Sequence, residues 1–303
     1  MNQAPVPRRE TPPLAAEFRA AIESPRPERS RSSGRPVVGY FCSYVPPELL
    51  LAAGLDPLRL RGLGVEDSSS GDAYLSHLTC SFARQVTAAV LDGVYDFLAG
   101  QISVNCCDHL RRANDVLVAK SRLSYHGYLS VPHSSRPDLL AWYLEELARL
   151  KDSLEDHFQV QITDEALQAA TAQTNRVRER MQKLDALRRG PKPKLSGADL
   201  LTAAVAARVL PPDSFVEKAD ALLAAAPAAG PRRRGRGVGR PRSPRGGAHF
   251  RQSSGRSPHA GGPSRSHPTR HRAPARPAPG EDWRGSRRGL RDVVRLVGSC
   301  RAS

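Results

Sequence analysis

The sequence predicts an α/β fold with a mostly parallel sheet, followed by a long helical pair and a basic tail. Short apolar, β-rich segments alternate with helical segments over residues 37–135. Two amphipathic patterns with three- and four-residue spacing follow, and from Pro231 onward Arg, Gly, Pro, Ser and His dominate. Alternating β and α segments are typical of a parallel sheet covered by helices. A composition like that of the tail cannot bury enough apolar surface to fold alone.

The N-terminal part divides into a leader and an α/β domain. Residues 1–36 are rich in Pro, Arg and Ser and are predicted to be a flexible leader with one short helix around 14–22. The first strand is expected at 37–42, and a helix begins at Pro46-Pro47 and ends before Gly54. A second apolar stretch at 58–63 continues this alternation, with further strands expected near 102–104 and 128–131 and further helices near 81–98 and 108–118. The predicted α/β domain therefore spans 37–135.

The two long helices are the next predicted elements. Apolar residues recur from Leu140 to Phe158 and from Leu167 to Leu184. Ser135 and Thr163 are candidate N-caps, and ordinary core packing is the favoured explanation of both stripes. Pro191 and Pro193 are expected to end the pair, and alanine-rich helices follow to about residue 226. Residues 136–230 are thus predicted to be a helical segment leading towards a second domain.

The charge of the chain is concentrated in its tail. The formal net charge is +16, from 46 Lys and Arg against 30 Asp and Glu. Residues 231–303 hold 19 Arg, no Lys and 3 acidic residues, which leaves 27 basic and 27 acidic residues in 1–230. The net charge therefore describes the partners of the tail and not those of the folded part. The tail is predicted to be disordered, with one weak helical pattern at 290–297.

The sequence gives no sign of a membrane or secreted protein. No run of about 18 apolar residues occurs, and the N-terminus lacks the apolar core of a secretory signal. The five cysteines are an odd number without the spacing of a small disulfide scaffold, which favours thiols or metal ligands. They are Cys42, Cys80, Cys106, Cys107 and Cys300. We therefore expect a cytoplasmic protein that is not attached to a membrane.

Two cysteine positions suggest chemistry. Cys106 and Cys107 lie between a predicted strand and a predicted helix, where α/β sheets place their sites. A helix N-terminus and the neighbouring Arg111 and Arg112 favour a thiolate there. Cys80 stands just before another predicted helix. Free cysteine is often a buried core residue, so on spacing alone an inert role is at least as well supported.

A series of motifs resembles the 2-hydroxyacyl-CoA dehydratase and benzoyl-CoA reductase family, over about residues 37–226. Its opening motif is matched by Val38-Gly39-Tyr40-Phe41-Cys42-Ser43-Tyr44-Val45-Pro46-Pro47-Glu48-Leu49. Later matches, in order, are Gly71-Asp72-Ala73-Tyr74-Leu75 with Cys80, Asp96-Phe97-Leu98, Cys107-Asp108-His109-Leu110-Arg111-Arg112, Leu129-Ser130-Val131-Pro132, Trp142 to Leu147, Ile162 to Leu167, Asn175, and Leu195-Ser196-Gly197.

The resemblance implies an oxygen-sensitive enzyme of anaerobic metabolism with two related subunits, each with two α/β domains. It implies a [4Fe–4S] cluster held by Cys80, by Cys107 and by a third cysteine in the C-terminal domain; Cys106 is then a core residue or a neighbour of the cluster ligands. A cluster with three protein ligands leaves one iron open as a Lewis acid. The implied reaction is radical elimination of water from a 2-hydroxyacyl-CoA thioester after one-electron reduction, or the related ring reduction. The electron comes from a separate ATP-dependent iron–sulfur activator.

Three further residues are candidates. Glu48 in the opening motif is a tentative catalytic or substrate-positioning residue, although the helix dipole alone explains a glutamate at that place equally well. His109 and His126 are weaker candidates for proton transfer, because a single histidine near a site is more often structural.

The sequence departs from the family after residue 230, since the second α/β domain with the third ligand is largely missing. The lysine-free, arginine-rich tail is the pattern expected of GC-rich coding sequence read out of frame, so the subunit is predicted to be truncated or frameshifted and inactive alone. Cys300 is not expected to replace the third ligand. Two alternatives remain open: a protein that binds RNA or other nucleic acid nonspecifically through its RG-rich tail, and a non-catalytic paralogue.

Overall fold

A computed structural model describes residues 13–24, 34–63, 65–132, 134, 136–189 and 194–225. All of them belong to one compact unit, and a second unit, residues 233–282, lies outside the described residues. The whole predicted tail, with Cys300 and the weak helical pattern at 290–297, also lies outside them, as do the candidate cap Ser135 and the prolines Pro191 and Pro193.

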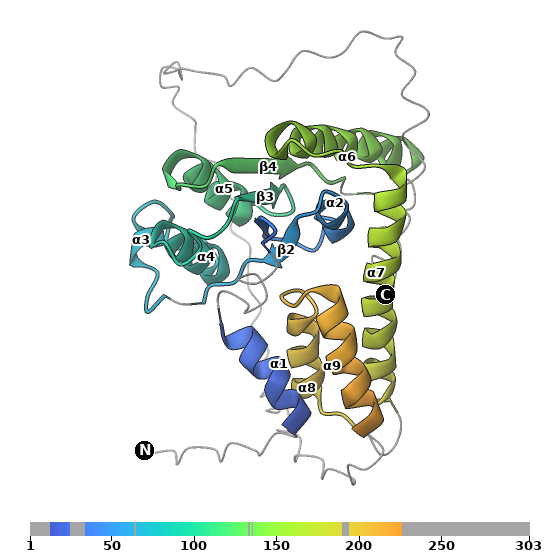
Figure 1. Cartoon of the computed structure of the whole chain (residues 1–303). Coiled ribbons are helices and arrows are strands. Elements are labelled where there is room, and N and C mark those ends of the chain that lie inside the picture. The colour runs from blue at the N-terminus through green and yellow to red at the C-terminus, as the bar shows by residue number, and fades with distance from the viewer. Residues whose placement is uncertain are drawn as a thin grey trace, which may run out of the picture. The chain divides into compact units, whose positions relative to one another are not determined.

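A four-stranded parallel sheet forms the centre of the α/β part, in the order β2-β1-β3-β4 (Figure 1). The strands are β1 (Val37–Tyr40), β2 (Asp56–Arg59), β3 (Gly100–Val104) and β4 (Tyr125–Leu129). The predicted α/β class with a parallel sheet is confirmed. The boundaries differ from the expected ones by a few residues, since β1 ends at Tyr40 and β4 begins at Tyr125.

Helices cover both faces of this sheet. Helices α4 (Ser81–Leu91) and α5 (Asp108–Lys120) share a buried apolar cluster with Val37 and Phe41 of the first strand segment. On the other face, Val38 and Tyr40 pack with α2 (Pro47–Ala52) and with the long helices that follow β4. Successive side chains along β1 point to opposite faces of the sheet, so they pack alternately into the two cores that lie on those faces. A short helix, α3 (Ser69–Asp72), contacts α4.

The long helical pair consists of α6 (Pro137–Phe158) and α7 (Asp164–Ala186). The Thr163 hydroxyl accepts a hydrogen bond from the Ala166 amide at 3.2 Å, so this predicted N-cap is present. The apolar stripe of α6 and the start of the α7 stripe are buried in the core that includes Tyr40, as expected of core packing, and the buried members are Tyr143, Leu147, Leu150, Leu154 and Leu167. The later residues of the α7 stripe, Val177, Met181 and Leu184, pack in a second core with Phe18 and Phe215.

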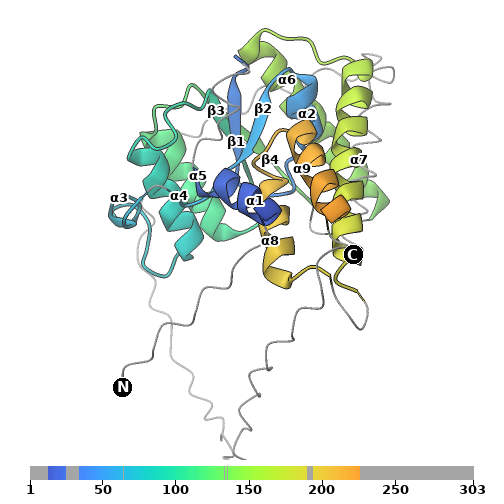
Figure 2. The same ribbon diagram turned by 60° about the horizontal axis from the view of Figure 1, so that its bottom comes forward.

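A helical bundle adjoins the C-terminal half of α7. It contains α1 (Pro13–Glu23), α8 (Gly197–Ala206) and α9 (Pro212–Ala225), which Figure 2 shows beside one another. Phe18 of α1 is 1% exposed and its ring lies 5.6 Å from that of Phe215. The Arg61 guanidinium donates to the carbonyl oxygens of Ile22 and Ser24 at the end of α1. Residues 13–24 of the predicted flexible leader thus form a packed helix, while 1–12 and 25–33 lie outside the described residues.

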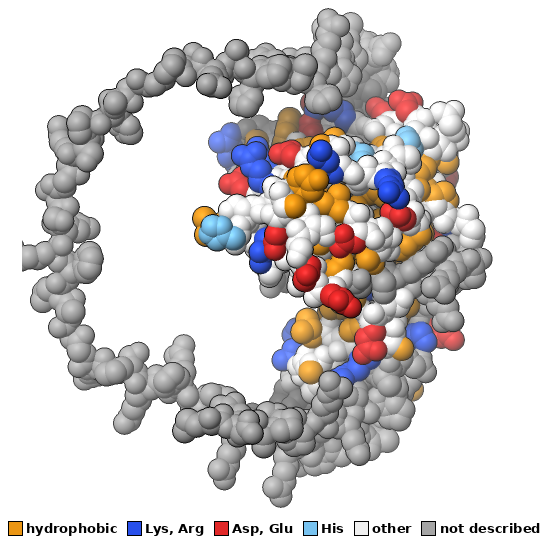
Figure 3. Space-filling view, turned by 90° about the vertical axis from the view of Figure 1, so that its left-hand side faces the viewer, with side chains coloured by type: hydrophobic (Ala, Val, Ile, Leu, Met, Phe, Trp, Pro, Cys, Tyr) orange, Lys and Arg blue, Asp and Glu red, His pale blue; other side chains and the backbone are white. Residues whose placement is uncertain are grey.

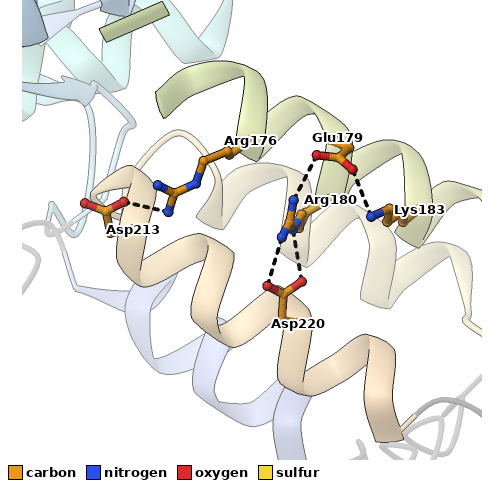
Figure 4. A network of polar contacts seen from close by, with 6 residues as sticks. All are labelled: Arg176, Glu179, Arg180, Lys183, Asp213 and Asp220. Carbon is orange, nitrogen blue, oxygen red and sulfur yellow. Dashed lines mark hydrogen bonds and ion pairs between the residues drawn. The ribbon is translucent and has the colours of Figure 1, made fainter. Parts of the chain in front are cut away.

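Ion pairs link α7 to α9 at the surface of the bundle (Figure 4). Arg176 pairs with Asp213 at 2.9 Å, and Arg180 pairs with Asp220 at 3.0 Å and also contacts Glu179. Ion pairs this exposed contribute little to stability, so the apolar cluster beneath them supplies most of the stability of the bundle. No helix in the described part of the chain is long and apolar enough to cross a membrane.

Candidate functional site

The candidate site lies at the carboxyl edge of the sheet, which is where open parallel sheets bind their ligands. β1 ends at Tyr40 and β3 ends at Val104, and these strands are neighbours in the sheet. The segment after β1 carries Cys42, and the segment after β3 carries Cys106 and Cys107. Three of the five cysteines therefore come to one edge of the molecule because two neighbouring strands end there.

Cys107 caps helix α5. Its backbone is extended, and its Sγ accepts a hydrogen bond from the Leu110 amide at 3.4 Å. The residue is exposed. A sulfur that accepts from a helix N-terminal amide is well placed to carry negative charge, which a metal-bound thiolate does.

Cys80 occupies the corresponding place before helix α4 and is also exposed. Its backbone N–H donates a hydrogen bond to Nδ1 of His109 at 2.8 Å. His109 lies in the first turn of α5, two residues after Cys107. The Cys80 segment and the first turn of α5, which carries His109, are therefore joined directly by this hydrogen bond.

Cys106 is half-buried between Cys42 and Cys107. Cys42 and Cys106 both pack against the cores on the two faces of the sheet. Burial raises the pKa of Cys106 to about 12, and the neighbouring Cys42 and Cys107 thiols add to the rise. Cys106 is therefore a protonated thiol at neutral pH. Sequence reasoning treated Cys42 only as part of a motif, and the pairing of β1 with β3 is the signal that would have placed it here.

Glu48 is a buried ion-pair residue of helix α2. Its side chain is 1% exposed, and Oε1 accepts from the Thr174 hydroxyl at 2.8 Å and from the Arg178 guanidinium, both on α7. Within the described residues Oε2 has no hydrogen-bond partner. These contacts of Glu48 hold α2 against α7. Its tentative catalytic role stays a prediction.

His126 lies apart from the cysteine loops. It is the second residue of β4 and pairs in register with Gln101 near the amino end of β3. Nδ1 of His126 is 3.1 Å from the Gln101 amide nitrogen, and Nε2 is 3.4 Å from the Ser121 hydroxyl. Burial lowers the pKa of His126, against an opposing hydrogen bond to the Leu123 backbone. The structure does not bring His126 to the candidate site.

The donor set suits part of the implied iron–sulfur cluster. Thiolates hold such clusters, and the two joined loops present two exposed thiols, Cys80 and Cys107. In the described ranges, no group of three or more His, Cys, Asp and Glu is arranged to hold a metal ion. Cys80 and Cys107 thus stay predicted ligands, and a third ligand is not identified among the described residues.

Comparison with known proteins assigns the family. Residues 42–245 match the model of "2-hydroxyglutaryl-CoA dehydratase, D-component". The chain belongs to the 2-hydroxyglutaryl-CoA dehydratase D-component family. It is 31% identical over 194 residues to one of the subunits of the benzoyl-CoA reductase of Thauera aromatica, covering 63% of this chain and 50% of that protein. It is 27% identical over 230 residues to the beta subunit of (R)-2-hydroxyglutaryl-CoA dehydratase of Acidaminococcus fermentans, covering 71% and 59%.

The match to this family is partial in length. A third relative, the beta subunit of (R)-phenyllactyl-CoA dehydratase of Clostridium sporogenes, is 26% identical over 159 residues, which are 51% of this chain and 42% of that protein. The chain thus spans about half the length of the curated relatives it matches. The family match ends at residue 245, which is past Pro231, the first residue of the predicted tail.

Proposed function

We propose that this chain is a subunit of an iron–sulfur enzyme of the 2-hydroxyacyl-CoA dehydratase type, which acts on a CoA thioester. The observation that carries the proposal is the pair of exposed thiols, Cys80 and Cys107, on two loops joined by the hydrogen bond from Cys80 to His109. Family membership supports the substrate class, because the matched relatives are named as acting on CoA thioesters.

Each residue of the site has a proposed task. Cys80 and Cys107 would hold a [4Fe–4S] cluster, which when bound supplies single electrons and an open iron as Lewis acid. His109 keeps the Cys80 loop beside the first turn of α5. Cys106, a protonated thiol, is placed to donate a weak hydrogen bond to the Cys107 sulfur. Glu48 fixes α2 through its contacts with Thr174 and Arg178, and a catalytic role for it stays tentative.

The proposed partners follow from the third ligand, which the described residues do not supply, and from the exposed surface around Cys80. We propose a related second subunit and an ATP-dependent iron–sulfur activator, and we expect this chain to be inactive alone. Leu78 is 77% exposed and Phe82 is 37% exposed on either side of Cys80. Figure 3 shows hydrophobic side chains gathered among charged ones on the face of α3 and α4. An apolar surface of this kind suits a protein partner.

The proposed division of the chain keeps four parts: a leader at 1–36 with the packed α1 inside it, an α/β domain at 37–135, a helical segment at 136–230 and a tail at 231–303.

For the tail we propose nonspecific binding of nucleic acid, because its 19 Arg and 3 acidic residues account for the whole net charge.

Anaerobic reconstitution with iron and sulfide tests the cluster assignment. We expect the unaltered chain to take up iron and sulfide in substoichiometric amounts and to lose them readily, because two ligands bind a cluster less firmly than three. Cys80→Ala and Cys107→Ala should each lower the bound iron and the iron–sulfur absorbance several-fold. Cys42→Ala, which removes a half-buried thiol from the same edge, is the matched control and should retain both. A full and stable cluster in Cys107→Ala would show that the ligand assignment is wrong.

A further inference from the structure

Beside the thiols, the carboxyl edge of the sheet carries an excess of positive charge that the cysteine chemistry does not use. Tyr40 and Arg59, the last residues of β1 and β2, are partners in the sheet register. Partners in neighbouring parallel strands project to the same face. Because Tyr40 packs in the core with α2, Arg59 projects to the face of α2 and α7.

The turn between α8 and α9 brings a second arginine to this place. The Arg59 amide donates to the carbonyl oxygen of Arg208 at 3.2 Å. Figures 1 and 2 both show this turn beside the end of β2. The Arg208 side chain lies beside the Tyr40 hydroxyl, and the charges of Arg59 and Glu48 also act on that hydroxyl. Two segments about 150 residues apart in the sequence thus place their guanidinium groups around one buried tyrosine.

The balance of charge at this edge is positive. Glu48 is the carboxylate that acts on the Tyr40 hydroxyl, and its Oε1 pairs with Arg178. Neither Arg59 nor Arg208 forms an ion pair with any residue in the described part of the chain. Both side chains are partly exposed. After Glu48 and Arg178 offset each other, the positive charges of Arg59 and Arg208 remain at this edge.

We infer that Arg59 and Arg208 form a phosphate-binding subsite at the carboxyl edge of the sheet, which holds a phosphate group of the CoA moiety. The inference rests on the proposed function for its choice of ligand. Guanidinium groups bind phosphate oxygens through paired, charge-assisted hydrogen bonds. Open parallel sheets take ligands at the edge where these arginines lie. CoA carries a pyrophosphate and a ribose phosphate, whereas pantetheine carries neither. A comparison of the two ligands therefore isolates the contribution of the phosphate groups to binding.

The test is isothermal titration of the full chain with CoA, pantetheine and inorganic pyrophosphate. We expect the double variant Arg59→Gln with Arg208→Gln to lower CoA affinity at least tenfold and to leave any pantetheine binding unchanged. The matched control is Arg149→Gln with Arg189→Gln, which removes the same charge from exposed arginines that pair within their own helix region. The control should bind CoA within twofold of the unaltered chain, and it shares any background from the arginine-rich tail.

A pair of lysine variants keeps the test informative if the glutamine variants unfold. Arg59→Lys with Arg208→Lys retains the charge and loses the paired geometry, so its CoA affinity should lie between those of the glutamine variant and the unaltered chain. Thermal unfolding of every variant shows which are folded. Equal CoA affinity in the folded glutamine or lysine variant, the control and the unaltered chain would overturn the inference.

The two proposals can fail separately. If CoA binds and its affinity does not depend on Arg59 or Arg208, the phosphate subsite is wrong while the proposed substrate class stands. If pyrophosphate binding depends on both arginines and CoA does not bind, a phosphate site exists here and the proposed CoA-thioester function is contradicted.

Discussion

At the scale of residues, the two histidines that were candidates for proton transfer have different surroundings and different uses. His109 accepts the Cys80 amide hydrogen bond through Nδ1, so a neutral His109 carries its proton on Nε2. His126 belongs to a polar group between the sheet and α5, in which the Gln101 amide nitrogen also contacts Asn114. One histidine therefore joins two loops of the candidate site, and the other satisfies buried polar groups of the sheet.

The lowered pKa of His126 predicts a dependence of stability on pH. The unfolded chain has the ordinary histidine pKa of about 6.5, and burial puts the folded value below it. Between these two values the unfolded chain binds more protons, so the free energy of unfolding falls as pH drops through this window. Urea unfolding at pH 7.5, 6.5 and 5.5, values chosen around the ordinary pKa of about 6.5, measures the effect.

The matched variants for that measurement are His126→Gln and His77→Gln. Glutamine at 126 can still bond to Gln101 and Ser121 but does not titrate, so its stability should fall less on acidification than that of the unaltered chain. His77 is exposed, and its replacement should leave the pH dependence unchanged. Parallel pH curves for His126→Gln and the unaltered chain would contradict this account.

At the scale of elements, the sequence pattern predicted the helix caps and ends, which depend on local side chains. It did not predict the strand boundaries or the packing partner of α1, which depend on contacts between elements. Thr163 was identifiable as a cap from its own side chain, and Gly54 was identifiable as a helix-ending residue, with φ at 72°. The end of β1 at Tyr40 and the start of β4 at Tyr125 depend on pairing with β3, which the sequence of either strand does not contain. The helical pattern at 14–22 was visible in the sequence, but its partner Phe215 is nearly 200 residues away.

The packing of α1 on the bundle predicts a large effect of one substitution. Phe18→Ala should lower the free energy of unfolding by about 3–5 kcal/mol, the range for removing a fully buried aromatic ring, because Phe18 is 1% exposed against Phe215. Urea unfolding with its slope measures the change. Leu201→Ala, at a side chain that is 66% exposed, should change stability by less than about 0.5 kcal/mol. Equal stability of Phe18→Ala and Leu201→Ala would mean that α1 does not contribute to the fold in solution.

At the scale of the whole molecule, the candidate site is a product of topology. Cys42 and Cys106 approach because β1 and β3 are neighbours, and Arg59 meets Arg208 because the α8–α9 turn reaches the end of β2. The order of the motifs pointed to Cys80 and Cys107 without knowledge of the strand order, because each of those motifs is continuous in the sequence. The arginine pair has no continuous motif, and sequence reasoning had no means to find it.

The distribution of charge predicts that nucleic-acid affinity belongs to the tail. Residues 1–230 carry 27 basic and 27 acidic residues, so they offer phosphates no net attraction, whereas residues 231–303 carry 19 Arg against 3 acidic residues. The full chain should bind single-stranded RNA of different sequences with similar affinity. That affinity should fall steeply with salt, because each neutralised phosphate releases counterions.

A chain that ends at Ala229 retains every described element and should lose this binding together with its salt dependence. Fluorescence anisotropy of labelled RNA at several salt concentrations, with both chains checked for cooperative unfolding, measures the difference. The arginine pair at the end of β2 is present in both chains. Because the electrostatic part of the RNA affinity grows with the number of phosphates contacted, these two arginines cannot replace the nineteen arginines of the tail. Retained binding by the shorter chain, selective for one RNA sequence, would instead place a nucleic-acid site on the folded part.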